Sequence, residues 1–205
     1  MRIFLKEKVP MTPETTQKTV LSFLESDCSY SLEIGCGVGF HPIRFAITHP
    51  QEKIIAIERT QEKFKKFHSR FINHHTPPNL LPLHADAVSI VTHCLPDKFF
   101  KKIVILYPNP ELKNKNQRWI NMPFFSELRR VLSDHGEIEL RTNIEQYAEE
   151  VITKSSSQKM YIHSQRSIDK TEIAKTHFEK KYLLRDQNCI ELILKKDLSD
   201  EKENG

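Results

Sequence analysis

The sequence predicts an α/β protein with a doubly wound, mostly parallel sheet that ends in an antiparallel strand pair. Two observations lead to this fold class. Short apolar runs alternate with segments of helical spacing over residues 30–153, and two β-like segments follow with a long polar connection between them. Parallel strands need crossover connections, which helices supply, so the alternation predicts helices on both faces of the sheet.

Five predicted strands are apolar runs bounded by turn residues, at residues 30–34, 53–57, 80–83, 103–106 and 137–140. Five predicted helices have apolar residues at helical spacing, at residues 42–48, 61–73, 87–94, 119–132 and 144–153. The antiparallel pair is expected at residues 160–164 and 189–194. A doubly wound sheet binds ligands beyond the carboxyl ends of its strands, so the residues that follow each strand are the candidates for chemistry.

Composition indicates one domain, residues 1–198, and a frayed tail at 199–205. Hydrophobic residues make up 38% of the 205 positions, which is enough for a sizeable core. The 31 Lys and Arg exceed the 27 Asp and Glu by a formal net charge of +4, so a polyanionic partner is compatible but not required. No segment approaches the roughly 18 apolar residues that span a bilayer, and we expect a cytoplasmic protein without a membrane partner.

The four cysteines are scattered without a C-x-x-C pair, so the sequence predicts neither a disulfide framework nor a zinc site. His74 and His75 are adjacent but lack further nearby ligands, and no metal site is expected. We expect a monomer or a weak homodimer.

A glycine-rich loop, Glu33-Ile34-Gly35-Cys36-Gly37-Val38-Gly39, follows the first predicted strand. Glycines at 35, 37 and 39 let the backbone turn sharply and approach a ligand closely. The dinucleotide fingerprint G-x-G-x-x-G needs glycine at position 40, where this chain has Phe40. The spacing E-x-G-x-G-x-G instead resembles the loop that receives S-adenosylmethionine in class I methyltransferases. Cys36 has no paired base beside it in sequence and is interpreted as a small pocket-lining residue.

Acidic residues also end the second and third strands. Glu58 can accept both hydroxyls of a ribose, and Asp86, followed by Ala87, can accept the exocyclic amine of an adenine. The alternatives are a solvated glutamate at a helix start and an N-cap aspartate. Together with the glycine loop, these residues predict a site for S-adenosylmethionine.

Three further motifs carry a resemblance. They are Tyr107-Pro108-Asn109-Pro110, then Arg141-Thr142-Asn143-Ile144-Glu145-Gln146-Tyr147-Ala148, and finally Thr176-His177-Phe178-Glu179. In this order the chain resembles the bacterial tRNA (guanine-N7)-methyltransferases over residues 31–195. That family has F-P-D-P-W-P-K with a basic run, T-D-x-x-x-Y-A, and T-K-F-E before the last strand.

The resemblance implies methylation of a guanine in the variable loop of tRNA, with S-adenosylmethionine as the cofactor. It implies that Glu33, Glu58 and Asp86 contact the cofactor. Residues implied to contact the substrate are Lys113, Asn143, Thr176, His177, Phe178 and Glu179. Asn109 occupies the position implied to be catalytic, and we expect the flanking prolines to direct its side chain into the cleft.

The chain departs from the family pattern at four positions. Asn109 and Asn143 replace aspartates, Glu111 replaces a tryptophan, and His177 replaces a lysine. Guanine N7 carries no proton and its methylation needs no general base, so an asparagine that retains one acceptor weakens recognition rather than deleting the mechanism.

Two alternatives stay open. The chain could be a methyltransferase with a different acceptor, since Asn109-Pro110 faintly resembles the Asn-Pro-Pro-aromatic loop that holds an amino group. It could instead be a non-catalytic homologue that binds the cofactor or tRNA.

Two basic segments are candidates for RNA contact. The favoured segment follows the loop Tyr107 to Pro110, which is expected to lie at the active site, and contains Lys113, Lys115 and Arg118. Lys63, Lys65, Lys66 and Arg70 are more typical of a solvated helix face. The apolar residues that begin at Trp119 are interpreted as core rather than as a platform for base stacking.

Overall fold

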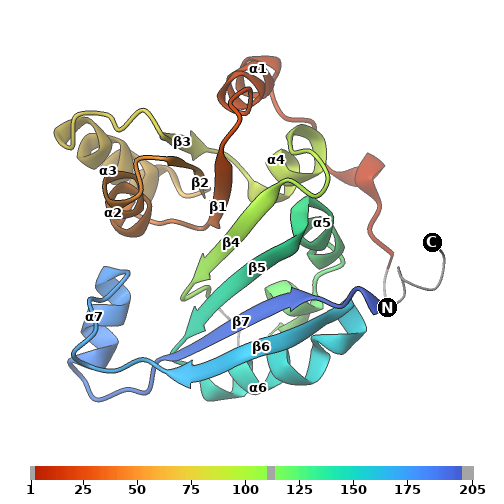
Figure 1. Ribbon diagram of the computed structural model, residues 1–205, viewed down its shortest axis with the longest axis vertical. Coiled ribbons are helices and arrows are strands. Elements are labelled where there is room, and N and C mark those ends of the chain that lie inside the picture. The colour runs from red at the N-terminus through yellow and green to blue at the C-terminus, as the bar shows by residue number, and fades with distance from the viewer. Residues whose placement is uncertain (1–2, 110–113, 200–205) are drawn as a thin grey trace.

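The computed structural model describes residues 3–109 and 114–199 and contains one seven-stranded sheet in the order β3-β2-β1-β4-β5-β7-β6 (Figure 1). Its strands are β1 (Ser29–Ile34), β2 (Glu52–Glu58), β3 (Leu80–His84), β4 (Phe100–Leu106), β5 (Leu132–Thr142), β6 (Met160–Ser167) and β7 (Ile190–Lys196). The first five strands are parallel, and β7 pairs antiparallel with both β5 and β6. The predicted fold class is confirmed.

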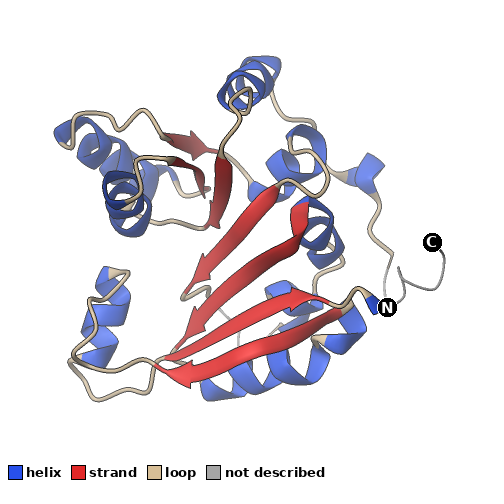
Figure 2. Cartoon of the chain, viewed as in Figure 1, coloured by secondary structure: helices blue, strands red, loops and turns tan. Residues whose placement is uncertain are grey.

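Seven α-helices accompany these strands in the described part of the chain (Figure 2). They are α1 (Glu14–Phe23), α2 (Phe40–Thr48), α3 (Gln61–Asn73), α4 (Ala87–Cys94), α5 (Phe125–Val131), α6 (Glu145–Lys154) and α7 (His177–Leu183). The bounds of α3 and α4 agree with the prediction. The prediction did not include α1 or α7.

The helix predicted over residues 119–132 is wrong in its first half. Short 3-10 turns occupy Lys115–Gln117 and Trp119–Asn121, and α5 begins only at Phe125. Met122 is extended, with φ −75° and ψ 135°, because the Pro123 ring that follows disfavours a helical conformation there. Leu132, assigned to the helix, instead starts β5.

Helices cover the two faces of the sheet in a pattern set by strand order. Right-handed crossovers place α2 and α3 on one face and α4, α5 and α6 on the other, because the direction of winding reverses between β1 and β4. Alternate residues of β2 confirm this: Ile54 and Ala56 pack with α2 and α3, whereas Ile55 and Ile57 join the larger core on the opposite face. This reversal is the switch point at which such sheets bind ligands.

Beyond β1, the face that carries α2 and α3 becomes polar. On β4 and β5 the core side holds Ile103 and Ile138, so the alternating residues Lys102, Glu139 and Arg141 lie on the other face. Figure 1 shows α7 beyond the ends of β4 and β5, apart from α4, α5 and α6. None of the helices in the described ranges is long and apolar enough to cross a membrane.

Candidate active site

A cavity of about 520 Å³ opens at the carboxyl ends of β1 to β4. The predicted site residues that line it are Glu33, Gly35, Gly37, Glu58, Asp86, Ala87, Asn109, Thr176, His177 and Phe178. Segments that are far apart in sequence therefore line one cavity. The volume lies within the range typical of small-molecule sites.

The three glycines of the loop have different physical roles. Gly35 and Gly37 have φ of +72° and +61°, and a Cβ on either would point into open space, so both leave backbone accessible beside the cavity. Gly39, with φ +75°, does not line the cavity. A Cβ there would lie 1.9 Å from the Phe67 ring, so Gly39 permits α3 to pack against the start of α2.

Glu58 holds the glycine loop in place. Its buried carboxylate accepts hydrogen bonds from the backbone N–H of Gly37 at 2.9 Å and of Thr60 at 2.6 Å. Each oxygen keeps a second lone pair, and the side chain still borders the cavity. Contact between Glu58 and a ribose stays a prediction.

Asp86 serves as the N-cap of α4, where its carboxylate accepts from Val88 N–H at 2.8 Å. It is also exposed to the cavity, so the capping and ligand interpretations are compatible. Glu33 also lines the cavity and is almost fully buried, with its Oε2 2.7 Å from Nδ1 of His41. Burial, and then the charges of Glu33 and Glu58, raise the pKa of the Cys36 thiol well above its ordinary value. Cys36 is a neutral lining residue.

These residues fit S-adenosylmethionine. Accessible backbone at Gly35 and Gly37 allows close approach of the ligand, and carboxylates end β1, β2 and the β3 loop around the same cavity. Contact of Gly39 with such a ligand finds no support, because Gly39 packs against Phe67 instead.

The loop after β4 has a constrained backbone. Tyr107 has φ +50°, a left-handed conformation that is rare for an aromatic residue and that costs free energy. Its N–H donates to Arg141 O at 2.8 Å, and its hydroxyl donates to Glu179 Oε2 at 2.7 Å. This anchoring fixes the course of the chain into Pro108 and Asn109, both of which line the cavity. Pro110 lies outside the described residues.

The Thr176-His177-Phe178 segment forms the wall across from the glycine loop. Thr176 caps α7 by accepting from Glu179 N–H at 3.0 Å, and the His177 and Phe178 rings lie 4.0 Å apart between centroids. The segment is tied to α2 because Arg44 donates to Ala174 O at 2.8 Å.

Glu179 differs from the expectation of substrate contact. It is fully buried and absent from the cavity wall. Its carboxylate accepts from the Arg141 guanidinium at 3.0 and 3.1 Å, from the Tyr107 hydroxyl and from Lys175 N–H at 2.8 Å. These partners occupy the carboxylate, so in this structure Glu179 positions α7 behind the wall.

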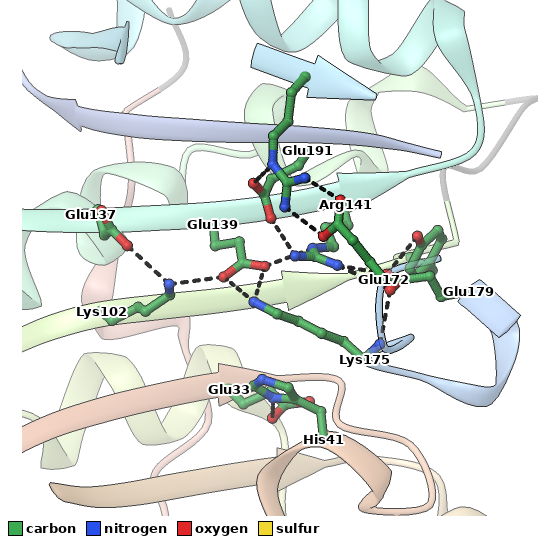
Figure 3. A network of polar contacts seen from close by, with 12 residues as sticks. Glu33, His41, Lys102, Glu137, Glu139, Arg141, Glu172, Lys175, Glu179 and Glu191 are labelled. Atoms are coloured by element: carbon green, nitrogen blue, oxygen red, sulfur yellow. Dashed lines mark hydrogen bonds and ion pairs between the residues drawn. The ribbon is translucent and has the colours of Figure 1, made fainter. Parts of the chain in front are cut away.

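Glu179 belongs to a wider buried charge network over β4, β5 and β7 (Figure 3). Glu139, at its centre, contacts Lys102 at 2.9 Å, Arg141 at 2.8 Å and Lys175 at 2.5 Å. Arg141 also pairs with Glu191, so one guanidinium joins three carboxylates. The network holds the segment before α7 against the sheet.

Other predicted substrate residues lie apart from the cavity. Asn143 does not line it and donates to Gln187 Oε1 at 3.1 Å. Lys113 lies outside the described residues. Arg118 is buried and paired with Glu150, so the expectation that it meets RNA was wrong for this structure.

Sequence reasoning did not assign Gln117, Trp119 and Met122 to the cavity wall, and it favoured a solvated helix face for Lys63, which also lines the cavity. Trp119 packs on Phe124 and also borders the cavity, so the core interpretation was incomplete. Its position after the active loop was an available signal. Across residues 3–109 and 114–199, no group of three or more His, Cys, Asp or Glu side chains is placed to hold a metal ion.

Comparison with solved structures supports the fold. The 16S rRNA methyltransferase KamB is 15% identical, with a TM-score of 0.67, over 94% of this chain and 98% of that chain. An antibiotic-related methyltransferase is also 15% identical, with a TM-score of 0.65, over 95% and 100% of the two chains. At these identities the likeness concerns the class I methyltransferase fold alone.

Curated relatives carry the name tRNA (guanine-N(7)-)-methyltransferase. The protein of Chlamydia pneumoniae is 27% identical over 132 residues, which are 63% of this chain and 58% of that protein. The protein of Saccharophagus degradans is 32% identical over 123 residues, which are 59% and 53% of the two. The chain thus spans little more than half of the length of these relatives. The sequence model of a family described as "Putative methyltransferase" matches residues 27–192, and the chain belongs to that family.

Proposed function

We propose that the protein is an S-adenosylmethionine-dependent methyltransferase whose acceptor is N7 of a guanine in tRNA. The observation that carries the proposal is the shared cavity. Its walls combine the glycine loop with Asn109 and with His177 and Phe178, so a methyl donor and an acceptor base can meet in one chamber. The names of the curated relatives support tRNA guanine as the acceptor.

The cofactor side is formed by β1, β2 and the β3 loop. Backbone at Gly35 and Gly37 accommodates close approach, Glu58 accepts from ribose hydroxyls, and Asp86 accepts from the adenine amine. Glu33 supplies negative charge for the amino group of the methionine moiety, and His41 fixes its orientation.

The acceptor side needs orientation rather than proton transfer. S-adenosylmethionine supplies an electrophilic methyl group on a sulfonium. Guanine N7 has an in-plane lone pair and no proton, so the protein must align that nitrogen with the methyl group. The Asn109 amide lies on the cavity wall and contains both donor and acceptor groups that suit the polar edges of guanine, and the His177 and Phe178 rings provide a surface for stacking.

The test uses tRNA from cells that lack 7-methylguanosine, incubated with the protein and S-adenosylmethionine and then digested for nucleoside mass spectrometry. We expect 7-methylguanosine, and a Glu58→Gln variant with reduced yield serves as the cofactor-site control. Another methylated nucleoside contradicts the acceptor assignment. Cofactor binding by calorimetry without any methylated nucleoside supports the non-catalytic alternative.

A further inference from the structure

A group of cations lies at the rim of the cavity, contributed by two helices from opposite walls. Lys63 and Arg70 are seven residues apart on α3, and His177 and Lys181 are four residues apart on α7, so each pair shares one helix face. Lys63 and His177 both line the cavity. We call these four residues the rim cluster.

The side chains of the rim cluster lie close enough to act on one another. Partial burial, followed by the positive charges of Arg70, Lys63 and Lys181, lowers the pKa of His177. On α7 itself, the ring nearest to the His177 imidazole is that of Phe178, which carries no charge. Lys63 of α3 and His177 of α7 line the same cavity, and Arg70 shares the helix face of Lys63, so both cations of α3 lie on the side of that helix that borders the cavity.

The permanent cations of the rim cluster are not held in ion pairs by described residues. Lys63, Arg70 and Lys181 form no ion pair with any carboxylate in residues 3–109 and 114–199, although each is exposed. By contrast, the cations of the buried charge network are paired: Lys102 on β4 pairs with Glu139, and Arg141 on β5 pairs with Glu179 (Figure 3). Like charges gathered without a partner repel one another, and a bound anion removes that repulsion.

The chemistry of the cavity points to the class of anion. A base that enters the cavity is connected through its ribose to phosphodiesters that stay outside, at the rim. Lys63 and His177 belong to both the cavity wall and the rim cluster, so the rim is adjacent to the position of the base. Lys and Arg side chains at such a point neutralise nucleic-acid phosphates.

We propose that the rim cluster binds the RNA phosphodiester adjacent to the nucleotide whose base enters the cavity, with α3 and α7 contacting the backbone from two sides. The proposal rests on the proposed function in that it requires an RNA substrate. It does not depend on which atom of the base is methylated.

The main experiment measures binding of fluorescent tRNA by anisotropy at several salt concentrations, with S-adenosylhomocysteine present. The variants are Lys63→Ala, Arg70→Ala and Lys181→Ala. Lys65→Ala is the matched control, because Lys65 is an exposed lysine on the opposite face of α3. Each rim variant is expected to weaken tRNA binding and to reduce the slope of log K against log salt by about 0.7–0.9, the value for one phosphate contact.

A second measurement distinguishes RNA from a free anion. The His177 ring is followed by NMR as pH is varied, with a short RNA oligonucleotide or with inorganic phosphate. Bound phosphodiester is expected to raise the pKa of His177 at micromolar oligonucleotide, while inorganic phosphate at that concentration leaves it unchanged. Equal effects of the two, or salt slopes of all three rim variants equal to that of Lys65→Ala, overturn the proposal.

The two proposals fail separately. If 7-methylguanosine forms in tRNA while the rim variants keep the wild-type salt slope, the rim assignment is wrong and the proposed function stands. If the rim variants lose tRNA binding while no 7-methylguanosine forms, the rim assignment stands and the proposed function is wrong, either in its acceptor or in its turnover.

Discussion

At the scale of single residues, Asn109 is the position where a small change should alter turnover most directly. It lines the cavity, and its amide has a single acceptor atom in place of the two oxygens of an aspartate. Asn109→Asp is expected to raise kcat/KM for tRNA about 10-fold, in line with the roughly 1–3 kcal/mol of a paired contact to a base edge. The measurement is initial rates of methyl transfer to unmodified tRNA.

Asn143→Asp provides the matched control for that change. Asn143 makes the same amide-to-carboxylate exchange but lies outside the cavity, donating to Gln187. Its effect on kcat/KM should stay within about twofold. A larger gain from Asn143→Asp than from Asn109→Asp contradicts the assignment of Asn109 to the acceptor side.

The glycines of the loop give a second test at this scale. In Gly39→Ala the new alanine must adopt a positive φ, which costs about 1–2 kcal/mol, and its Cβ must also displace the Phe67 ring. The free energy of unfolding is expected to fall by about 2–5 kcal/mol in total. Gly35→Ala carries only the backbone cost, because its Cβ meets open space. Urea unfolding compares the two, and equal losses contradict a packing role for Gly39.

At the scale of elements, α7 depends on contacts from distant strands. The helix has seven residues and only Leu183 and Glu179 of it are buried, so its own burial and propensity provide little stability. Glu179 links it to Arg141 on β5 and to Tyr107 after β4. One carboxylate thus positions both the acceptor wall, formed by Thr176 to Phe178, and the loop from Tyr107 to Asn109.

Glu179→Gln should therefore loosen the acceptor wall without affecting the cofactor side. An amide has one acceptor atom where Arg141, Tyr107 and Lys175 N–H all donate, and each lost bond to a charged group contributes about 1.5–3 kcal/mol. We expect KM for tRNA to rise at least 10-fold with the Kd of S-adenosylhomocysteine unchanged. Amide hydrogen exchange over residues 171–183 should become faster.

Tyr107→Phe is the milder comparison, since it removes one of these bonds and keeps the ring. A parallel loss of S-adenosylhomocysteine affinity in Glu179→Gln contradicts a role confined to the acceptor wall. Unchanged exchange over residues 171–183 contradicts the role of Glu179 in positioning α7.

Sequence patterns captured the elements whose causes are local. The bounds of α3 and α4 could be predicted because apolar spacing and a capping residue such as Asp86 act within a few positions. The end of each strand likewise located Glu58 and Asn109 on the cavity wall. Helix α7 was missed because its stability comes from Arg141 and Tyr107, which no local pattern relates to it.

The same distinction applies within the site. Gly39 fits the spacing of a cofactor loop, yet glycine is needed there because a Cβ would collide with the Phe67 ring on α3. Glu179 fits a substrate motif, yet three-dimensional contacts bury it. Pairing between a residue and a partner 38 or 72 positions away has no periodic signature in the sequence.

At the scale of the whole molecule, the two halves of the sheet are stabilised differently on one face. Over β2 and β3 that face packs an apolar cluster against α2 and α3, which includes Ile54 and Phe67. Over β4, β5 and β7 it carries the buried charge network instead (Figure 3). Buried ion pairs compensate each other only while every member keeps its charge, so this half of the sheet should be the more sensitive to acid.

Glu139 is the group through which that sensitivity acts. Burial alone raises its pKa, but the charges of Lys175, Lys102 and Arg141 outweigh burial and hold the pKa of Glu139 well below its ordinary range. The folded protein thus binds this proton less readily than the unfolded chain does. The stabilisation is complete above the unfolded pKa of about 4.3 and declines as pH falls below that value towards the folded pKa.

Urea unfolding at pH 7, 5, 4 and 3 tests this dependence. Glu139→Gln should be less stable than the wild type at pH 7, because it leaves Lys175 and Lys102 without their shared carboxylate. Its stability should then fall less steeply between pH 5 and pH 3, since the titrating group is gone. The control is Glu62→Gln, which changes an exposed carboxylate of α3 and should follow the wild-type curve. Parallel curves for Glu139→Gln and wild type would show that the acid sensitivity originates elsewhere.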